Sequence, residues 1–92
     1  MTEILVTSLR SDLYRVEVNE GATTTVHDVT VAPDDLASLA AGHGCEALLE
    51  ESFRFLLERE PKEAILPRFE LQVITRYFPD YPAEIIRRMK AR

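Results

Sequence analysis

The sequence predicts an α+β fold: an N-terminal three-stranded antiparallel meander (residues 3–31) packed against four or five short C-terminal helices (within residues 33–90). The first part is rich in β-branched residues and alternates apolar with polar side chains, the pattern of a strand with one solvated face. The second part has apolar residues at helical spacing, interrupted by prolines that a helix interior does not tolerate. A chain of 92 residues has room for one small core, so we expect a single domain over residues 1–92.

Short turns join the predicted strands. An apolar run at residues 4–6 opens the first strand, and residues 10–12 provide the turn that follows it. Residues 14–19 alternate apolar with polar side chains, and residues 19–22 form a hairpin loop in which Gly21 can adopt a positive φ. Strands joined by such turns pair antiparallel, which makes a meander. The third strand places four side chains on one face: Thr25, His27, Val29 and Val31.

The first two helices have recognisable starts. Pro33 suits a first helical position, and the helix that it opens should end near Gly42. The next helix begins near Cys45 and continues to about Glu60. Its apolar face is broad, which indicates that it lies between neighbouring elements. This face carries Cys45, Leu48, Leu49, Ser52, Phe53 and Leu56, with Phe55 and Leu57 beside them.

Prolines divide the rest of the chain into shorter helices. Pro61 either ends the preceding helix or begins a short one that reaches Leu66. A further helix is predicted over residues 70–78 and a last one over residues 83–90. The prolines within residues 79–82 separate these two helices.

The charge of the chain is unevenly distributed. A net charge of −5 disfavours a protein built around phosphate contacts. Yet the chain ends with a basic tail, which holds four of the 11 basic residues: Arg87, Arg88, Lys90 and Arg92. Cations at the end of a helix complement its dipole, and this is the favoured interpretation of the tail. The alternative is a small site that contacts an anion or RNA.

The sequence also bears on the cellular compartment of the protein and on its cofactors. The N-terminus lacks the pattern of a signal peptide, no apolar run is long enough to cross a membrane, and one cysteine cannot form an internal disulfide. We therefore expect a cytoplasmic protein without membrane contact. No phosphate-binding or dinucleotide motif is present among its three glycines, so no cofactor is expected.

Reactive side chains gather only at His43 and Cys45. A cysteine at a helix N-terminus can have a lowered pKa, and a neighbouring histidine can act as its base. The favoured alternative is a packed cysteine beside a solvated histidine. With the distant His27 these residues match no zinc spacing, so neither a metal site nor an enzyme is expected.

Aromatic residues concentrate near the C-terminus, at Phe69, Tyr77, Phe78 and Tyr81. Such a group can stack on nucleobases or anchor a protein interface, although helical packing accounts for most of it. Tyr81, between Asp80 and Pro82, is predicted to lie exposed in a loop. We take Tyr81, Tyr77 and Phe78 as the candidate interface residues.

The string FLLEREPKEAILPRF (Phe55–Phe69), followed by Leu71, Val73-Ile74 and Arg76–Pro79, resembles a small bacterial protein family of unknown function with a signature of FLLEREP…RYFP type. The resemblance covers residues 53–82 well and the N-terminal strands only in outline. It implies a bacterial cytoplasmic protein and brings no activity, cofactor or catalytic residue with it.

Together these features favour a non-enzymatic protein-interaction module over an enzyme. An acidic surface and an apolar helical half suit a protein partner, and they leave self-association as a homodimer open. The alternative is a nucleic-acid-linked, antitoxin-like regulator that uses the basic tail. A thiol-dependent enzyme at Cys45 is the third hypothesis.

Overall fold

The computed structural model describes residues 1–92, and its one sheet combines three N-terminal strands with a short strand from the C-terminal half. It has four strands in the order β1-β2-β3-β4: β1 (Thr2–Arg10), β2 (Leu13–Glu20), β3 (Thr23–Thr30) and β4 (Arg68–Glu70). The first three run antiparallel, and β4 pairs parallel with β3. The α+β class and the antiparallel meander are therefore confirmed, whereas the predicted count of three strands is wrong.

The register of the meander follows from its apolar side chains. Val6 pairs with Val16, and Val16 pairs with His27, so these three side chains form one row across the sheet. The row lies on the inner face, where Val16 and His27 are buried. Gly21 turns between β2 and β3 with a φ of 62°, as predicted.

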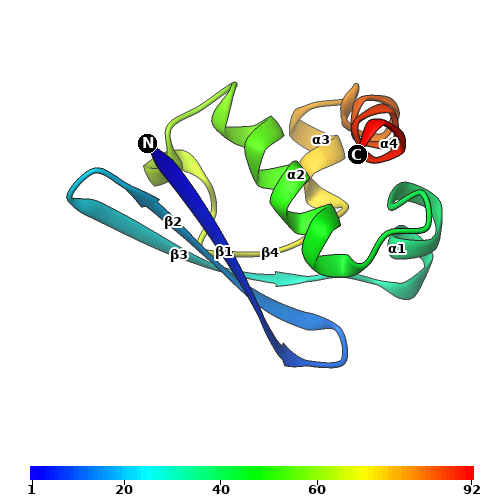
Figure 1. The fold of residues 1–92 in the computed structure, drawn as a ribbon, viewed down its shortest axis with the longest axis horizontal. Helices are drawn as coiled ribbons and strands as arrows, with labels where there is room; N and C mark the ends of the chain where they lie inside the picture. The colour runs from blue at the N-terminus through cyan, green and yellow to red at the C-terminus, as the bar shows by residue number, and fades with distance from the viewer.

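The helices cover one face of the sheet (Figure 1). They are α1 (Pro33–Leu39), α2 (Cys45–Leu57), α3 (Val73–Tyr77) and α4 (Tyr81–Ala91), with a short 3-10 helix, η1 (Lys62–Ala64). The long helix α2 packs against both β1 and α4. None of these helices combines the length and the apolar composition that crossing a membrane requires.

The two halves of the chain share one hydrophobic core of 18 buried residues. The predicted apolar face of α2 is buried throughout, from Cys45 to Leu56. Phe55, predicted to lie beside that face, is also fully buried because α4 covers it. Its ring meets the rings of Phe78 and Tyr81 edge-on, at centroid distances of 5.9 Å and 5.2 Å.

The segment between α2 and α4 differs from the prediction. Residues 70–78 do not form one helix, because Arg68–Glu70 extends along β3 and only Val73–Tyr77 is helical. The Asp28 N–H donates to the Pro67 carbonyl, and the Leu71 N–H donates to the Thr30 carbonyl, both at 2.9 Å. Hydrogen bonds to the free edge of β3 keep this segment extended, so helix α3 starts only at Val73. Pro61 was expected either to end the preceding helix or to begin a short one: α2 ends before it at Leu57, and only the three-residue η1 follows it.

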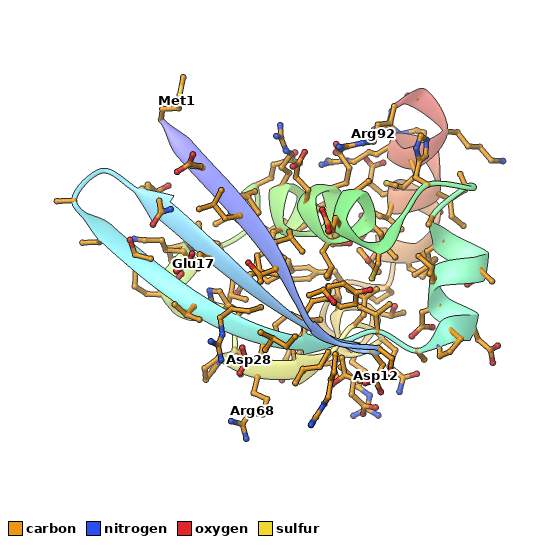
Figure 2. All side chains as sticks on the ribbon, turned by 60° about the horizontal axis from the view of Figure 1, so that its bottom comes forward. Met1, Asp12, Glu17, Asp28, Arg68 and Arg92 are labelled. Atoms are coloured by element: carbon orange, nitrogen blue, oxygen red, sulfur yellow. The ribbon has the colours of Figure 1, made fainter.

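The face of the sheet turned away from the helices combines ion-paired side chains with the exposed apolar Leu5 and Val26. Arg15 pairs with Asp28 across β2 and β3, with Nε 3.0 Å from Oδ1. This hydrogen bond holds the pKa of the Asp28 carboxyl below its usual value. Figure 2 shows Asp28 and Arg68 projecting from the open face, and Arg68 pairs with Asp28 in the register of β3 and β4.

Candidate functional site

An apolar pocket lies where the end of α2 meets η1, β4 and α3. Its volume is about 140 Å³, and ten residues line it, nine of them hydrophobic. The hydrophobic residues are Leu56, Ala64, Ile65, Leu66, Phe69, Val73, Ile74, Tyr77 and Phe78, and the tenth is Glu60. We call this space the α2–α3 pocket.

The α2–α3 pocket reaches from the core to the solvent. Leu56, Ile65 and Ile74 are buried and form its base. At its mouth, 43% of Leu66 and 66% of Tyr77 is exposed. Large apolar side chains exposed side by side around a hollow are typical of a surface that binds a partner.

His27 holds one wall of the pocket in place. Its Nδ1 lies 2.8 Å from the Leu66 carbonyl oxygen, and its Nε2 lies 2.8 Å from the Thr25 hydroxyl. Because a carbonyl can only accept, Nδ1 carries the proton of the first bond. The predicted inner-face position of His27 is confirmed, and its contacts fasten the Leu66 backbone to β3.

Glu60 is the only charged residue in the pocket lining, and its carboxylate makes none of the ion pairs or side-chain hydrogen bonds of the structure. The two cations nearest to Glu60 in the sequence, Arg59 and Lys62, face elsewhere. Arg59 contacts Glu58 and Asp80, at 3.6 Å and 3.2 Å, and Lys62 contacts Thr23, Glu20 and Glu63. The negative charge at the pocket is therefore not neutralised within the chain.

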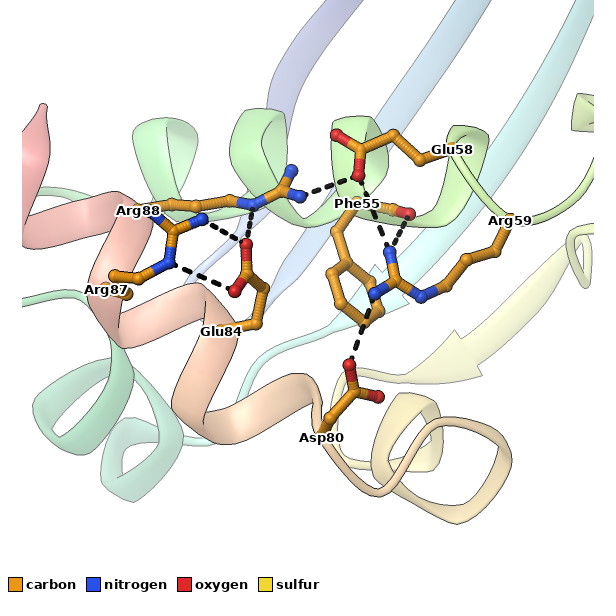
Figure 3. Close-up of polar contacts among 7 residues, drawn as sticks. All are labelled: Phe55, Glu58, Arg59, Asp80, Glu84, Arg87 and Arg88. Carbon is orange, nitrogen blue, oxygen red and sulfur yellow. Dashed lines mark hydrogen bonds and ion pairs between the residues drawn. The ribbon is translucent and has the colours of Figure 1, made fainter.

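A network of arginines joins the end of α2 to α4 beside the pocket (Figure 3). The Arg59 guanidinium lies 3.7 Å from the centre of the Phe55 ring and donates to the Phe55 carbonyl at 3.2 Å. Arg88 donates to both Glu58 and Glu84, each at 2.7 Å. Hydrogen bonds from Arg87 and Arg88 lower the pKa of Glu84 to about 2.

Tyr81 is not the exposed interface residue that the sequence predicted. It is 0% exposed and opens α4, with Pro82 in the first helical turn. The sequence between the two prolines starts a helix rather than forming a loop. The Tyr81 hydroxyl lies 2.6 Å from Ser52 Oγ on α2, and burial raises the pKa of this phenol well above its usual value.

The other two candidate interface residues lie together at the pocket. Tyr77 is exposed and Phe78 is half-buried, and both line the pocket. Sequence reasoning missed its other walls: Leu56, Ala64, Ile65, Leu66, Phe69, Val73 and Ile74, together with Glu60. One signal was available in the sequence: the apolar pair Ile65-Leu66 lies between Pro61 and Pro67. The segment between these prolines is too short to form a helix that would bury both side chains.

The basic tail is mostly engaged by acids of the same chain. Arg87 pairs with Glu84, Arg88 pairs with Glu84 and Glu58, and Arg92 pairs with Glu50 and Glu51. Among its four basic residues, Lys90 alone makes no ion pair. These pairs compete with any external anion, which weakens the tail as a nucleic-acid contact.

Cys45 lies at the start of α2 and is buried, while His43 is exposed. Burial raises the pKa of the Cys45 thiol, the opposite of the change that a reactive thiolate needs. This favours the interpretation of Cys45 as a packing residue. The structure brings no group of three or more His, Cys, Asp or Glu side chains together that could hold a metal ion.

Comparison of the chain with protein-family models, with curated proteins and with solved structures gives no match. The resemblance of residues 53–82 to a small bacterial family therefore stays a prediction. The geometry of the α2–α3 pocket is the remaining guide to function.

Proposed function

We propose that the protein is a non-enzymatic interaction module whose protein partner docks at the α2–α3 pocket. The observation that carries this proposal is the exposed Tyr77 at the mouth of an apolar hollow that reaches the core. Tyrosine rings beside a desolvated pocket supply much of the energy of protein interfaces. The exposed Leu66 on the same rim adds apolar surface that a partner can cover.

The chemistry of the lining supports binding rather than catalysis. No cysteine, histidine, serine, threonine or lysine side chain lines the pocket, and Glu60 is its one carboxylate. Glu60 and Tyr77 are the only ionisable residues of the lining. The other eight residues suit an apolar side chain of a partner.

The competing function is the nucleic-acid-linked regulator that uses the basic tail. A net charge of −5 and the ion pairs of Arg87, Arg88 and Arg92 both oppose it. Binding through phosphate contacts would have to break these pairs and would weaken steeply with salt. One experiment can distinguish the protein-interaction module from the nucleic-acid-linked regulator.

The test is affinity capture by the tagged full chain from a lysate of its own host, with and without nuclease. The two variants are Tyr77→Asp at the pocket and Val26→Asp on the open face of the sheet, where 45% of Val26 is exposed. We expect a protein that survives nuclease to be retained by the wild type and by Val26→Asp and to be lost with Tyr77→Asp. A partner retained equally by Tyr77→Asp, or recovery of nucleic acid alone, would contradict the proposal.

A further inference from the structure

We propose that the α2–α3 pocket binds a peptide segment of its partner in which one large apolar side chain stands close to a lysine or arginine. The apolar side chain fills the pocket, and the cation pairs with Glu60. This inference rests on the proposed function, because it defines the partner chemistry of the same pocket.

The size of the pocket determines the apolar half of this ligand. A cavity of about 150 Å³ lined by Leu, Ile and Phe is known to accommodate one benzene ring. The α2–α3 pocket, at about 140 Å³, matches that space. A single Leu, Met or Phe side chain therefore fills it, whereas drug-sized ligands and cofactors occupy about 300 Å³ or more.

Glu60 explains why the peptide ligand should carry a lysine or arginine. Glu60 is half-buried, its carboxylate has no ion-pair partner within the chain, and the residue belongs to an otherwise hydrophobic lining. Arg59 cannot readily turn toward it, because the guanidinium is stacked on Phe55 and hydrogen-bonded to Asp80. A cation brought in by the ligand would find this carboxylate free, and the nearby apolar surface strengthens their attraction relative to bulk water.

The charge of the whole molecule favours the same ligand. A net charge of −5 attracts a basic segment and repels an acidic one during the first encounter. Glu58 and Glu63 flank the end of α2 but are already paired with Arg88 and Lys62. Among these three glutamates, Glu60 is the one that remains available to a ligand.

The test is selection of a phage-displayed library of random 12-residue peptides on the immobilised full chain. We expect enriched peptides to carry Leu, Met or Phe with Lys or Arg within four positions. Synthetic copies should lose binding to Tyr77→Asp and should bind Glu60→Gln about two- to fivefold more weakly than the wild type. Glu46→Gln is the matched control, because Glu46 is exposed, unpaired and outside the pocket, and removes the same charge.

The outcomes separate this inference from the proposed function. Selected peptides that need Tyr77 but show no basic preference, or that bind Glu60→Gln as well as the wild type, overturn the inference and leave the interaction module intact. A selection that enriches no peptide dependent on Tyr77 overturns the inference, and a captured partner that also ignores Tyr77 overturns the proposed function. A dimer detected by sedimentation and abolished by Tyr77→Asp would show that a second copy fills the pocket, which contradicts a peptide ligand.

Discussion

Ser52, His27 and Lys62 are the buried polar residues of the chain, and each joins segments far apart in sequence. Ser52 meets Tyr81, His27 meets Leu66, and Lys62 meets Thr23. No buried side-chain nitrogen or oxygen lacks a partner. A sequence pattern can place a buried polar residue on the inner face of a strand or helix, as it did for His27. It does not identify the hydrogen-bond partner, because that partner comes from a segment far away in the sequence. For that reason Tyr81 was predicted to be exposed and the role of Lys62 was missed.

The Ser52–Tyr81 hydrogen bond predicts unequal losses of stability when either residue is replaced. Ser52 donates to the Leu48 carbonyl at 2.7 Å, so its oxygen accepts from the Tyr81 hydroxyl. Tyr81→Phe should therefore cost about 1 kcal/mol of unfolding free energy, because Ser52 keeps its other bond. Ser52→Ala leaves the buried Tyr81 hydroxyl unpaired and should cost about 1–3 kcal/mol.

Urea unfolding of both single variants and the double variant measures the coupling. The double variant should lose less than the sum of the two, by about 1 kcal/mol. Strictly additive losses would show that the two hydroxyls do not interact.

Lys62 holds the β2–β3 hairpin against η1. It is only 2% exposed, and its Nζ donates to the Thr23 hydroxyl at 2.6 Å. Lys62→Ala should lower the unfolding free energy by about 1–3 kcal/mol, because the charged hydrogen bond and the packing of the side chain are lost together. Lys90→Ala, at an exposed lysine without an ion pair, should change it by about 0.5 kcal/mol or less. Equal effects of the two substitutions in chemical denaturation would refute this role.

At the scale of elements, the strongest local patterns predicted the structure best. The wide apolar arc of α2 and the alternation in β2 each extend over several residues. Both elements start within a residue of the predicted position, although α2 ends at Leu57 rather than near Glu60. The strand β4 has three residues, too few to show a period of two, and forms because β3 offers it an open edge. Local sequence around Arg68–Glu70 cannot reveal an edge supplied by a strand some forty residues earlier.

Helix α4 should lose stability in acid, because Glu84 pairs with Arg87 and Arg88 of the same helix. Hydrogen bonds from Arg87 and Arg88 lower the pKa of Glu84 from 4.5 to about 2 in the folded protein. A lowered folded pKa contributes stability that is complete above the unfolded pKa and is lost as the pH falls through the folded pKa. The stabilisation by Glu84 should therefore decline between about pH 4.5 and pH 2.

Urea midpoints of the wild type and of Glu84→Gln at pH 5, 3.5 and 2.5 check this window. The two proteins should differ most at pH 5 and converge as the pH falls. Glu46→Gln, at a glutamate without an ion pair, serves as the control. A difference between the wild type and Glu84→Gln that is constant with pH would show that the ion pairs do not contribute.

On the scale of the whole molecule, one side of the sheet packs against the helices and the other faces the solvent. The helices and the inner face make the core, and the outer face carries ion pairs beside the exposed Leu5 and Val26. The α2–α3 pocket lies where the helical layer leaves a gap. Tyr77 and Phe78 were predicted as interface residues and do line this pocket. Glu60 could not be predicted as part of a pocket, since the lining residues come together only when β4 pairs with β3.

The most direct test of the docking site is a two-dimensional ¹H–¹⁵N titration of the full chain with N-acetyl-phenylalanyl-arginine amide. The control probe replaces arginine with citrulline, which keeps the shape and removes the charge. Shift changes confined to Glu60, Ala64–Leu66 and Val73–Tyr77, and weaker with citrulline, are the predicted result. Changes that centre on the open face around Val26 or on the basic tail, or no change at millimolar probe, would contradict it.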